Sequence, residues 1–336
     1  MGMIDQREKT IVFCATQAHA LAASLLSLPL AAPALAQAPM WPSKPITVLV
    51  GIGAGSNTDV LARIAARRLS ERLKQPVVVD NRPGAGGTIA AAAVAAAPPD
   101  GYTLLWASSS IPLFPHMYDN LKFDPTKDLV GVGGVAEGGL VMLTRSSAPW
   151  KTLEDLIAYG KSKPKGTITY ASAGIGSNAY LFSELFAQAA GLELVHVPYK
   201  GSSAALADVV SGQVDFVFDG PSTAVPQVDA GRVRALAFST KNRSAFMPNV
   251  PSMEEAGAKG FAQRTWLGFF APASTPKAVV ERLSEEIAAF VAQPSFRQEL
   301  AGASHEPMKM TSADFTSMVR RETDEWGQRI KNIKLK

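Results

Sequence analysis

Cysteine is nearly absent from this chain of 336 residues, in which Cys14 is the single example. Cys14 lies in an apolar N-terminal segment that we expect to be removed, so the remaining chain would have neither disulfides nor a catalytic thiol. A lipid-attachment signal needs a small residue before the cysteine, and Phe13 occupies that position. The sequence therefore predicts a chain stabilised by its core, which a protein of this length is large enough to build.

The chain also lacks a large excess of charge of either sign. Its 33 basic and 29 acidic residues leave a formal net charge of only +4. The basic residues are scattered and are not interleaved with aromatic residues, so we expect no nucleic-acid partner. A mildly basic protein is compatible with an anionic ligand. Beyond the N-terminal segment no apolar run approaches the roughly 20 residues that span a bilayer.

The N-terminus has the pattern of a secretory signal peptide. Arg7 and Lys9 precede an alanine-rich apolar stretch at 18–36, which ends in small residues suited to signal cleavage. Pro29 and Pro33 interrupt this stretch, which argues against a retained membrane anchor. We therefore predict a signal peptide over residues 1–36, cleavage near Ala36 and a periplasmic protein.

Strand and helix patterns alternate along the rest of the chain, which predicts an α/β fold. Apolar, β-rich runs occur at 46–50, 102–107 and 167–171, and amphipathic helices are expected at 58–74 and 179–190. About 300 residues after the signal suggest two lobes.

A strand, a glycine-rich turn, the tripeptide Gly-Ser-Asn and a helix occur in this order twice. The first copy is Gly55-Ser56-Asn57 and the second is Gly176-Ser177-Asn178. Each copy places backbone N–H groups and a capping side chain at a helix N-terminus, which favours anion binding. Two ordinary helix caps would give the same pattern. Asp59 lies in the first helical turn, where we expect it to orient the loop amides and not to touch an anion.

Polar residues also follow two predicted strands. Ser108 and Ser109 come after the strand at 102–107, and Asp219 comes after the strand at 214–218. Ligands of open α/β sheets bind beyond the carboxyl ends of the strands. The hydroxyl groups could donate to a carboxylate, while Asp219 could accept from a ligand or only fix the turn that precedes Gly220-Pro221.

Two enzyme classes fit poorly. Gly51 and Gly53 imitate a dinucleotide-binding turn, but Ser56 stands at the third glycine and Asp80 lies 29 positions from Gly51, where about 20 is usual. The G-x-S-x-G element of hydrolases is missing. The histidines outside the signal, His116, His196 and His305, lack metal-site spacing. We therefore expect no enzyme, no cofactor and no metal, although an exported hydrolase remains an alternative.

Several short stretches, in a fixed order over essentially the whole exported chain, match one family. They are Trp41-Pro42-Ser43-Lys44-Pro45-Ile46, Gly55-Ser56-Asn57-Thr58-Asp59, the run from Pro76 to Gly87, the run from Pro99 to Leu104, Tyr170-Ala171-Ser172-Ala173-Gly174-Ile175-Gly176-Ser177, His196-Val197-Pro198-Tyr199-Lys200-Gly201, Gly212-Gln213-Val214-Asp215, Ala235-Leu236-Ala237 and Ala271-Pro272-Ala273-Ser274-Thr275-Pro276. With these stretches the chain resembles the periplasmic receptors of tripartite tricarboxylate transporters, the Bug family.

The resemblance implies a two-lobed periplasmic-binding-protein fold of type II with a hinge. We expect lobe one at 39–139 plus 240–336 and lobe two at 140–239. It also implies capture of a small carboxylate, often a dicarboxylate, for a two-subunit membrane permease. We expect a monomer that binds a di- or aromatic carboxylate, and a ligand-sensing module is the alternative. The expected ligand-binding residues are Ile52, Gly55, Ser56, Asn57, Thr58, Asp59, Ser108, Ser109, Ala173, Gly174, Gly176, Ser177, Asn178 and Asp219.

The first loop departs from the family pattern at Gly51, Ile52 and Ser56. Gly51 stands where the family usually has proline, and Ser56 where it has a second glycine. Ile52 replaces an aromatic side chain. The smaller isoleucine would leave room for a bulkier or aromatic acid.

Overall fold

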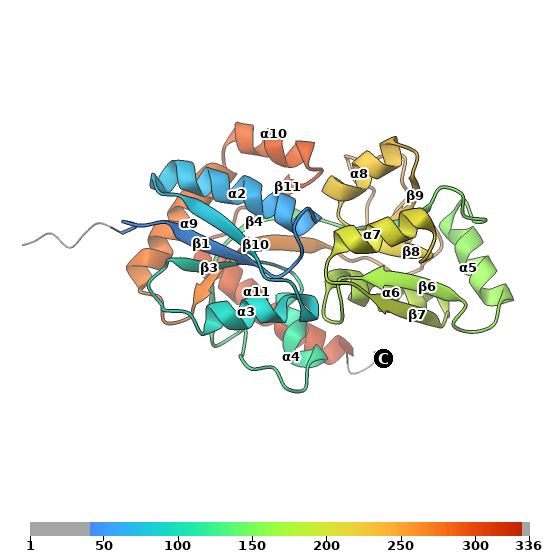
Figure 1. Cartoon of the computed structure of the whole chain (residues 1–336), viewed down its shortest axis with the longest axis horizontal. Coiled ribbons are helices and arrows are strands. Elements are labelled where there is room, and N and C mark those ends of the chain that lie inside the picture. The colour runs from blue at the N-terminus through green and yellow to red at the C-terminus, as the bar shows by residue number, and fades with distance from the viewer. Residues whose placement is uncertain (1–40, 331–336) are drawn as a thin grey trace, which may run out of the picture. The chain divides into compact units, whose positions relative to one another are not determined.

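The computed structural model describes residues 41–330, which form two mixed β-sheets flanked by helices (Figure 1). The predicted signal peptide, Cys14 and the cleavage position lie outside these residues. Within the described part, no helix combines the length and the apolar character needed to cross a bilayer.

The first sheet has six strands in the order β11-β4-β10-β3-β1-β2. Their bounds are β1 Ile46–Val50, β2 Val77–Asn81, β3 Thr103–Ser108, β4 Leu129–Gly138, β10 Thr265–Pro272 and β11 Glu306–Pro307. Strand β1 is parallel to β2 and β3, while β10 is antiparallel to β3 and β4. Because β1 and β3 run in parallel, their carboxyl ends lie at the same edge of the sheet.

Alternate residues of β1 and β3 enter two cores, one on each face of this sheet. Val48 and Val50 pack with α2 (Asn57–Leu73), α9 (Lys277–Val291) and α10 (Pro294–Gly302). Leu49 packs on the other face with α3 (Thr88–Ala95) and α11 (Ser312–Ile330). Short helical turns at Ala85–Gly87, Ile111–Leu113 and Phe114–Met117 complete the elements around this sheet.

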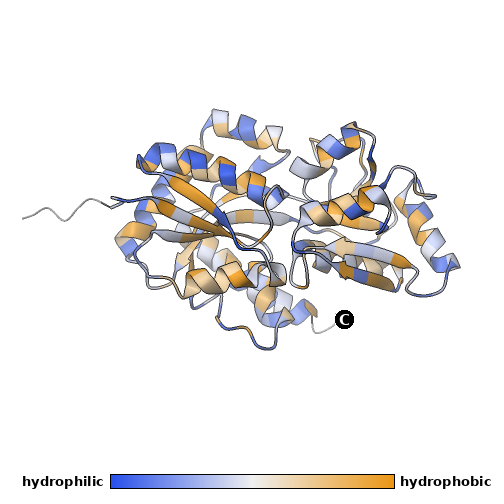
Figure 2. Cartoon of the chain, in the orientation of Figure 1, coloured by the Kyte–Doolittle hydropathy of each residue, from blue (hydrophilic) through white to orange (hydrophobic). Residues whose placement is uncertain are grey.

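Helix α2 confirms the sequence pattern that predicted it. Leu61, Ala65, Leu69 and Leu73 are buried along one face, as their i+4 spacing requires. Figure 2 shows the resulting alternation of apolar and polar residues on α2, against strands that are mainly apolar. The helix is therefore held by burial of this stripe against the sheet.

The second sheet has five strands in the order β7-β6-β8-β5-β9. The bounds are β5 Val141–Arg145, β6 Ile168–Ser172, β7 Leu194–Pro198, β8 Phe216–Asp219 and β9 Val233–Phe238. Tyr170 and Phe218 pack on one face with α5 (Leu153–Ser162) and α6 (Asn178–Ala190). Val217 packs on the other face with α7 (Ser202–Ser211) and α8 (Pro221–Asp229).

The chain passes from one sheet to the other between β4 and β5 and returns between β9 and β10. Ser239, which is fully buried, connects these two passages. Its hydroxyl accepts from the Leu140 amide at 2.9 Å and donates to the Gln263 carbonyl at 2.9 Å. The two passages are thus tied together by side-chain hydrogen bonds as well as by backbone ones.

Candidate functional site

The first glycine-rich loop connects β1 to α2 and ends in a capped helix N-terminus. The Ser56 side chain accepts a hydrogen bond from the Asp59 amide at 3.3 Å, which identifies Ser56 as the N-cap. Gly55 has a φ of 74°, a left-handed conformation that favours glycine. The first amides of α2 have no partner within the helix, and the Ser56 side chain satisfies that of Asp59.

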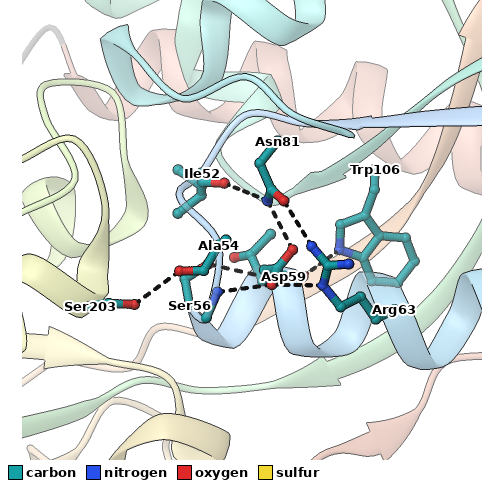
Figure 3. A network of polar contacts seen from close by, with 10 residues as sticks. Ile52, Ala54, Ser56, Asp59, Arg63, Asn81, Trp106 and Ser203 are labelled. Carbon is teal, nitrogen blue, oxygen red and sulfur yellow. Dashed lines mark hydrogen bonds and ion pairs between the residues drawn. The ribbon is translucent and has the colours of Figure 1, made fainter. Parts of the chain in front are cut away.

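Asp59 braces this loop through its carboxylate (Figure 3). Its carboxylate accepts from the Gly55 amide at 2.9 Å, from Arg63 Nε at 3.0 Å and from the Asn81 side chain at 2.9 Å. Asn81 also donates to the Ile52 carbonyl at 3.0 Å. Burial by itself would raise the pKa of Asp59, but the bonds from Arg63, Gly55 and Asn81 hold that pKa below its usual value. Asp59 thus orients a loop amide, as the sequence predicts.

The second glycine-rich loop, between β6 and α6, repeats the cap without the charges. The Ser177 side chain accepts from the Tyr180 amide at 3.3 Å and donates to the Gly174 carbonyl at 2.7 Å. The Ser172 hydroxyl accepts from the Gly174 amide at 3.0 Å. This loop is therefore shaped by neutral hydrogen bonds.

His196 contributes to the support of the second loop. Its Nε2 lies 2.7 Å from the Ser172 hydroxyl, and its ring stacks on Tyr170 with centroids 5.0 Å apart. Burial lowers the pKa of His196, which favours the neutral imidazole. The residue is a hydrogen-bonded, partly buried residue of β7.

Side chains from the two Gly-Ser-Asn copies reach across to elements of the opposite sheet. Asn57 Oδ1 accepts from the Ser222 amide at 3.2 Å and from the Ser222 hydroxyl at 2.6 Å. Asn178 Nδ2 donates to the Ser109 hydroxyl at 3.1 Å and to the Ser108 hydroxyl at 3.3 Å. Each copy therefore caps its own helix with serine and contacts the other sheet with asparagine.

Tyr118 and two glycines bring backbones together at the same place. The Tyr118 hydroxyl lies within hydrogen-bonding distance of the Ala85 and Ile175 carbonyls, and burial raises its pKa to about 12. A Cβ atom at Gly86 would clash with the Ile175 carbonyl, and one at Gly220 would clash with Asn57. The close approach therefore depends on glycine at both positions.

A cavity of about 70 Å³ lies among these loops. Its walls come from the N-terminal turns of α2 and α6, from the carboxyl ends of β3 and β8, and from the start of α7. The lining residues are Ile52, Asn57, Thr58, Gly86, Ser108, Ser110, Leu140, Ala173, Ser177, Asn178, Ala179, Ser202, Phe218, Asp219 and Gly220.

Eight residues selected from the sequence line this cavity: Ile52, Asn57, Thr58, Ser108, Ala173, Ser177, Asn178 and Asp219. Six others support it without lining it: Gly55, Ser56, Asp59, Ser109, Gly174 and Gly176. Gly55 lines a separate surface hollow with residues of α7 and α8. The structure thus divides the predicted set into wall residues and residues that shape the loops.

Sequence reasoning missed seven lining residues: Gly86, Ser110, Leu140, Ala179, Ser202, Phe218 and Gly220. Ser110 ends the serine run that begins at Ser108, and Gly220 directly follows Asp219, so the rule about strand ends covered both. Leu140, Gly86 and Ser202 reach the cavity only through the packing of distant segments, for which the sequence carries no local signal.

Asp219 is the one ionisable side chain among the lining residues that the structure describes. It is 3% exposed, and its carboxylate accepts from the Thr223 hydroxyl at 2.6 Å. Burial raises the pKa of Asp219 to about 6, against the opposing effect of hydrogen bonds from Thr223, the Gly220 amide and Ser202. The cavity wall therefore contains a carboxyl group that changes charge near neutral pH.

Among the described residues, Ser56, Ser108 and Ser177 are not paired with a histidine or a carboxylate side chain, and no metal centre is grouped around the cavity. Ser56 and Ser177 bond to backbone groups, and Ser108 bonds to the Ser110 hydroxyl at 3.0 Å and to the Asn178 side chain. Within residues 41–330, no three His, Cys, Asp or Glu side chains are grouped to hold a metal ion. The arrangement suits binding through amides and hydroxyls.

Comparison with known proteins gives consistent matches along the chain. The family model described as tripartite tricarboxylate transporter family receptor matches residues 61–335. A UPF0065 protein of Bordetella bronchiseptica is 37% identical over 328 residues, which cover 96% of each chain.

Solved structures of the same kind match over most of the chain. The periplasmic binding protein BugD is 31% identical with a TM-score of 0.83, covering 87% of this chain and 98% of its own. An R. palustris protein solved with adipate is 34% identical with a TM-score of 0.83, covering 87% and 97%. MatC from Rhodopseudomonas palustris, solved with bound malate, is 31% identical with a TM-score of 0.79, covering 86% and 99%.

Proposed function

This chain belongs to the tripartite tricarboxylate transporter receptor family, the Bug family, and on that premise we propose that it captures a small organic carboxylate in the periplasm for a membrane transporter. The observation that carries the proposal is the cavity between two capped helix N-termini, those of α2 and α6. Unpaired amides and the positive end of the helix dipole both favour an anion there.

The composition of the cavity wall supports a carboxylate as the ligand. Ser108, Ser110 and Ser202 supply hydroxyl groups that can donate to carboxylate oxygens. Related proteins were solved with adipate and with malate, which are both dicarboxylates. A dicarboxylate could place one carboxylate at each of the two helix N-termini, and an aromatic acid is the second class that we propose.

We propose that the protein works as two lobes that close by a hinge motion. The expected lobes, 39–139 plus 240–336 and 140–239, agree with the strand content of the two sheets. The expected boundary at residue 240, where the chain returns to lobe one, is moved in this proposal. Met253 and Phe261 share a core with Phe182 of α6 and Phe218 of β8. We therefore place residues 240 to about 264 with lobe two, and Ser239 at the hinge.

The remaining parts of the proposal rest on the family. We propose that the chain is exported by cleavage near Ala36, acts as a monomer without enzymatic activity, and delivers its ligand to a two-subunit permease. The family model supports delivery to a membrane transporter, and the periplasmic location in the name of BugD supports export.

A thermal-shift screen tests carboxylate capture. The panel holds adipate, malate, citrate and benzoate together with the corresponding amides. A ligand that binds the native state stabilises it by about 2.7 kcal/mol at 100 times its Kd, so the Tm should rise with at least one acid. The uncharged amide of that acid should leave the Tm unchanged. An equal rise with acid and amide would contradict the proposal.

The size of the ligand is tested at Ile52, which lines the cavity. If Ile52 makes room for a bulky acid, the Ile52→Phe variant should lose affinity for benzoate by more than tenfold and keep its affinity for malate. Calorimetric titration of both acids measures this ratio. An unchanged ratio would show that position 52 does not set the ligand size.

A further inference from the structure

Asp219 poses an electrostatic problem for a site that binds anions. It ends β8 in the wall of the cavity, it is almost fully buried, and it faces the same space as Asn57 and Ser177 at the two helix N-termini. The cavity is small enough that a bound carboxylate would lie within a few ångströms of every wall. Two carboxylate charges at that separation repel strongly in a poorly solvated site.

The described surroundings offer Asp219 no cation that would offset this repulsion. The groups that act on it are uncharged: the Thr223 and Ser202 hydroxyls and the Gly220 amide. The ionisable residues on the elements packed against β8 or next to Asp219 are Tyr170, Tyr180, Glu184, Arg145, Asp208, Asp229, Asp59 and Lys200. None of them is among the causes that shift the pKa of Asp219.

Several of these residues are bonded elsewhere. Tyr170 donates to Glu184 at 2.5 Å, Tyr199 donates to Asp208 at 2.6 Å, and Arg145 donates to the Gly212 carbonyl at 3.1 Å. Asp59 is paired with Arg63, while Asp229 and Lys200 are exposed. The charge of Asp219 can be removed by protonation, whereas no cation among residues 41–330 acts on its carboxylate.

We propose that Asp219 takes up one proton when the site binds a carboxylate, so that the protein captures the acid anion and a proton together. The inference rests on the proposed function, since it needs an anionic ligand in this cavity. In the bound state the proton taken from solvent lies on the Asp219 carboxyl group. The resulting O–H can donate to a ligand carboxylate oxygen, which turns a repulsive contact into a hydrogen bond.

The proton linkage fixes the sign and size of the pH effect. The free carboxyl group has a pKa of about 6, and a nearby ligand carboxylate raises that pKa further. Between the free and the bound pKa, each binding event takes up about one proton. The Kd should therefore increase by nearly tenfold for each pH unit between about 6 and the pKa of the bound state, and level off above that pKa; below about 6, Asp219 should contribute no slope. A residue that only caps the turn before α8 would give no such slope.

Isothermal titration of the protein with adipate, between pH 5.5 and 8.5, tests the inference. Malate serves as a second probe, because the carboxyl groups of both acids are largely ionised over the upper part of this range. Titration in two buffers of different ionisation enthalpy gives the number of protons taken up. We expect close to one proton at pH 7.5 for the wild type.

The Asp219→Asn variant keeps the shape of the side chain and is neutral at every pH. We expect it to bind adipate with a Kd that is level across the range, with no proton uptake, and tighter than the wild type by about tenfold or more at pH 8. Asp229→Asn, an exposed position in α8, is the matched control and should keep the wild-type slope. Thermal melting establishes that each variant is folded, and Asp219→Ser replaces Asp219→Asn if the latter is not.

The outcomes separate this inference from the proposed function. Binding of either acid with a Kd that does not depend on pH, and without proton uptake, overturns the role of Asp219 and leaves carboxylate capture intact. If neither acid binds at pH 5.5, nor any acid of the thermal-shift panel, carboxylate capture fails and the proton coupling fails with it. A slope that persists in Asp219→Asn assigns the proton to another group and also overturns the inference.

Discussion

The two Gly-Ser-Asn segments solve the same local problem with different chemistry. In both, the serine side chain caps the helix by accepting a hydrogen bond from the backbone amide three residues further on, at 3.3 Å in each case. The first segment is then braced by an ionised network of Asp59, Arg63 and Asn81. The second is braced by neutral groups, with Tyr180 standing where the first has Asp59. A shared tripeptide therefore specifies the cap but not what supports it.

The difference has a consequence for electrostatics. The Asp59 carboxylate at the first loop is stabilised by hydrogen bonds from Arg63, the Gly55 amide and the Asn81 side chain. It does not line the cavity. On the opposite side, Asp219 lines the cavity together with Ser177 and Asn178, and no cation of the described residues is among the groups that shift its pKa. Asp59 and Asp219 therefore have pKa values shifted in opposite directions, and the two sides of the site should respond differently to substitution and to pH.

Removing the charged brace should produce the largest effect. Asp59→Ala deletes an acceptor of three hydrogen bonds and leaves Arg63 and Asn81 without their common partner. Hydrogen bonds to charged groups contribute about 1.5–3 kcal/mol each, so the free energy of unfolding should fall by about 3 kcal/mol. Urea denaturation at pH 7 measures the change.

Asp80→Ala is the matched control for Asp59→Ala. Asp80 forms an exposed ion pair with Arg82, and such pairs contribute less than about 1 kcal/mol. A similar loss of stability in the two variants would show that the first loop is not held by its ionic brace.

The opposed pKa shifts predict opposed pH effects on stability. The pKa of Asp219 is raised from 3.8 to about 6 in the folded state, so its ionisation destabilises the protein above that pH. Asp219→Asn should raise the free energy of unfolding at pH 7.5, by at most about 3 kcal/mol for a shift of roughly two pKa units. The gain should shrink as the pH falls from 6 towards 3.8 and be nearly absent at pH 3.5, where Asp219 is protonated in the folded state and mostly protonated in the unfolded state.

Asp59 should show the reverse behaviour, because its folded-state pKa is lowered. Its contribution is present above pH 3.8 and is lost as the pH falls through the lowered value. Urea denaturation of wild type, Asp59→Ala and Asp219→Asn at pH 3.5, 5 and 7.5 measures both trends. A gain from Asp219→Asn that persists undiminished at pH 3.5 would mean that the substitution acts through packing and not through ionisation.

The sequence predicts individual helices and strands well, but it predicts the close packing of segments that are far apart in the chain poorly. Helix α2 was predictable because four apolar side chains repeat at i+4, and β1 because its apolar run is bounded by a glycine turn. Strand β4 was missed, since its glycines at 131, 133 and 134 weaken any strand pattern. Those glycines are required by packing, because a Cβ atom there would press on Phe315, Ile287 and Met308.

The same limit applies to the site and to the other missed elements. Strand β10 and helices α8 and α10 also lay outside the sequence prediction. Both caps were readable from residue type and spacing, and both were placed correctly. The contact of Asn57 with Ser222 could not be predicted from the sequence. It joins residues 165 positions apart and depends on Gly220 lacking a side chain. The sequence thus predicts the helix caps but not the distant residues that the neighbouring side chains contact.

Asn57 and Asn178, whose side chains bond to elements around the opposite sheet, should give smaller effects when replaced. Asn57→Ala and Asn178→Ala each remove two hydrogen bonds that join elements of different sheets. At a net contribution of about 0.5–1.5 kcal/mol, each substitution should raise the Kd for a bound acid by roughly two- to tenfold. Small-angle scattering of the ligand-free protein should show a larger radius of gyration. No change in either quantity would mean that these bonds do not favour the closed form.

The capping serines should give the smallest effect and the most direct test of the shared tripeptide. Replacing an N-cap serine by alanine costs about 1 kcal/mol, so Ser56→Ala and Ser177→Ala should lower the free energy of unfolding by similar amounts. Ser177→Ala should cost slightly more, because its hydroxyl also donates to the Gly174 carbonyl at 2.7 Å. Thermal melting of the two variants measures the difference.

Aspartate at these caps separates the stability role from the ligand role. An aspartate side chain caps a helix as well as serine does, so Ser56→Asp and Ser177→Asp should restore stability to within about 0.5 kcal/mol of the wild type. The added negative charge lies beside the site proposed for the ligand carboxylate and should weaken binding of adipate by tenfold or more. Ser312→Asp, at the start of α11, is the control with no expected effect on binding. If the two cap variants kept full affinity, the helix N-termini would serve only the fold, and the ligand would be held by the serine hydroxyls of the cavity wall.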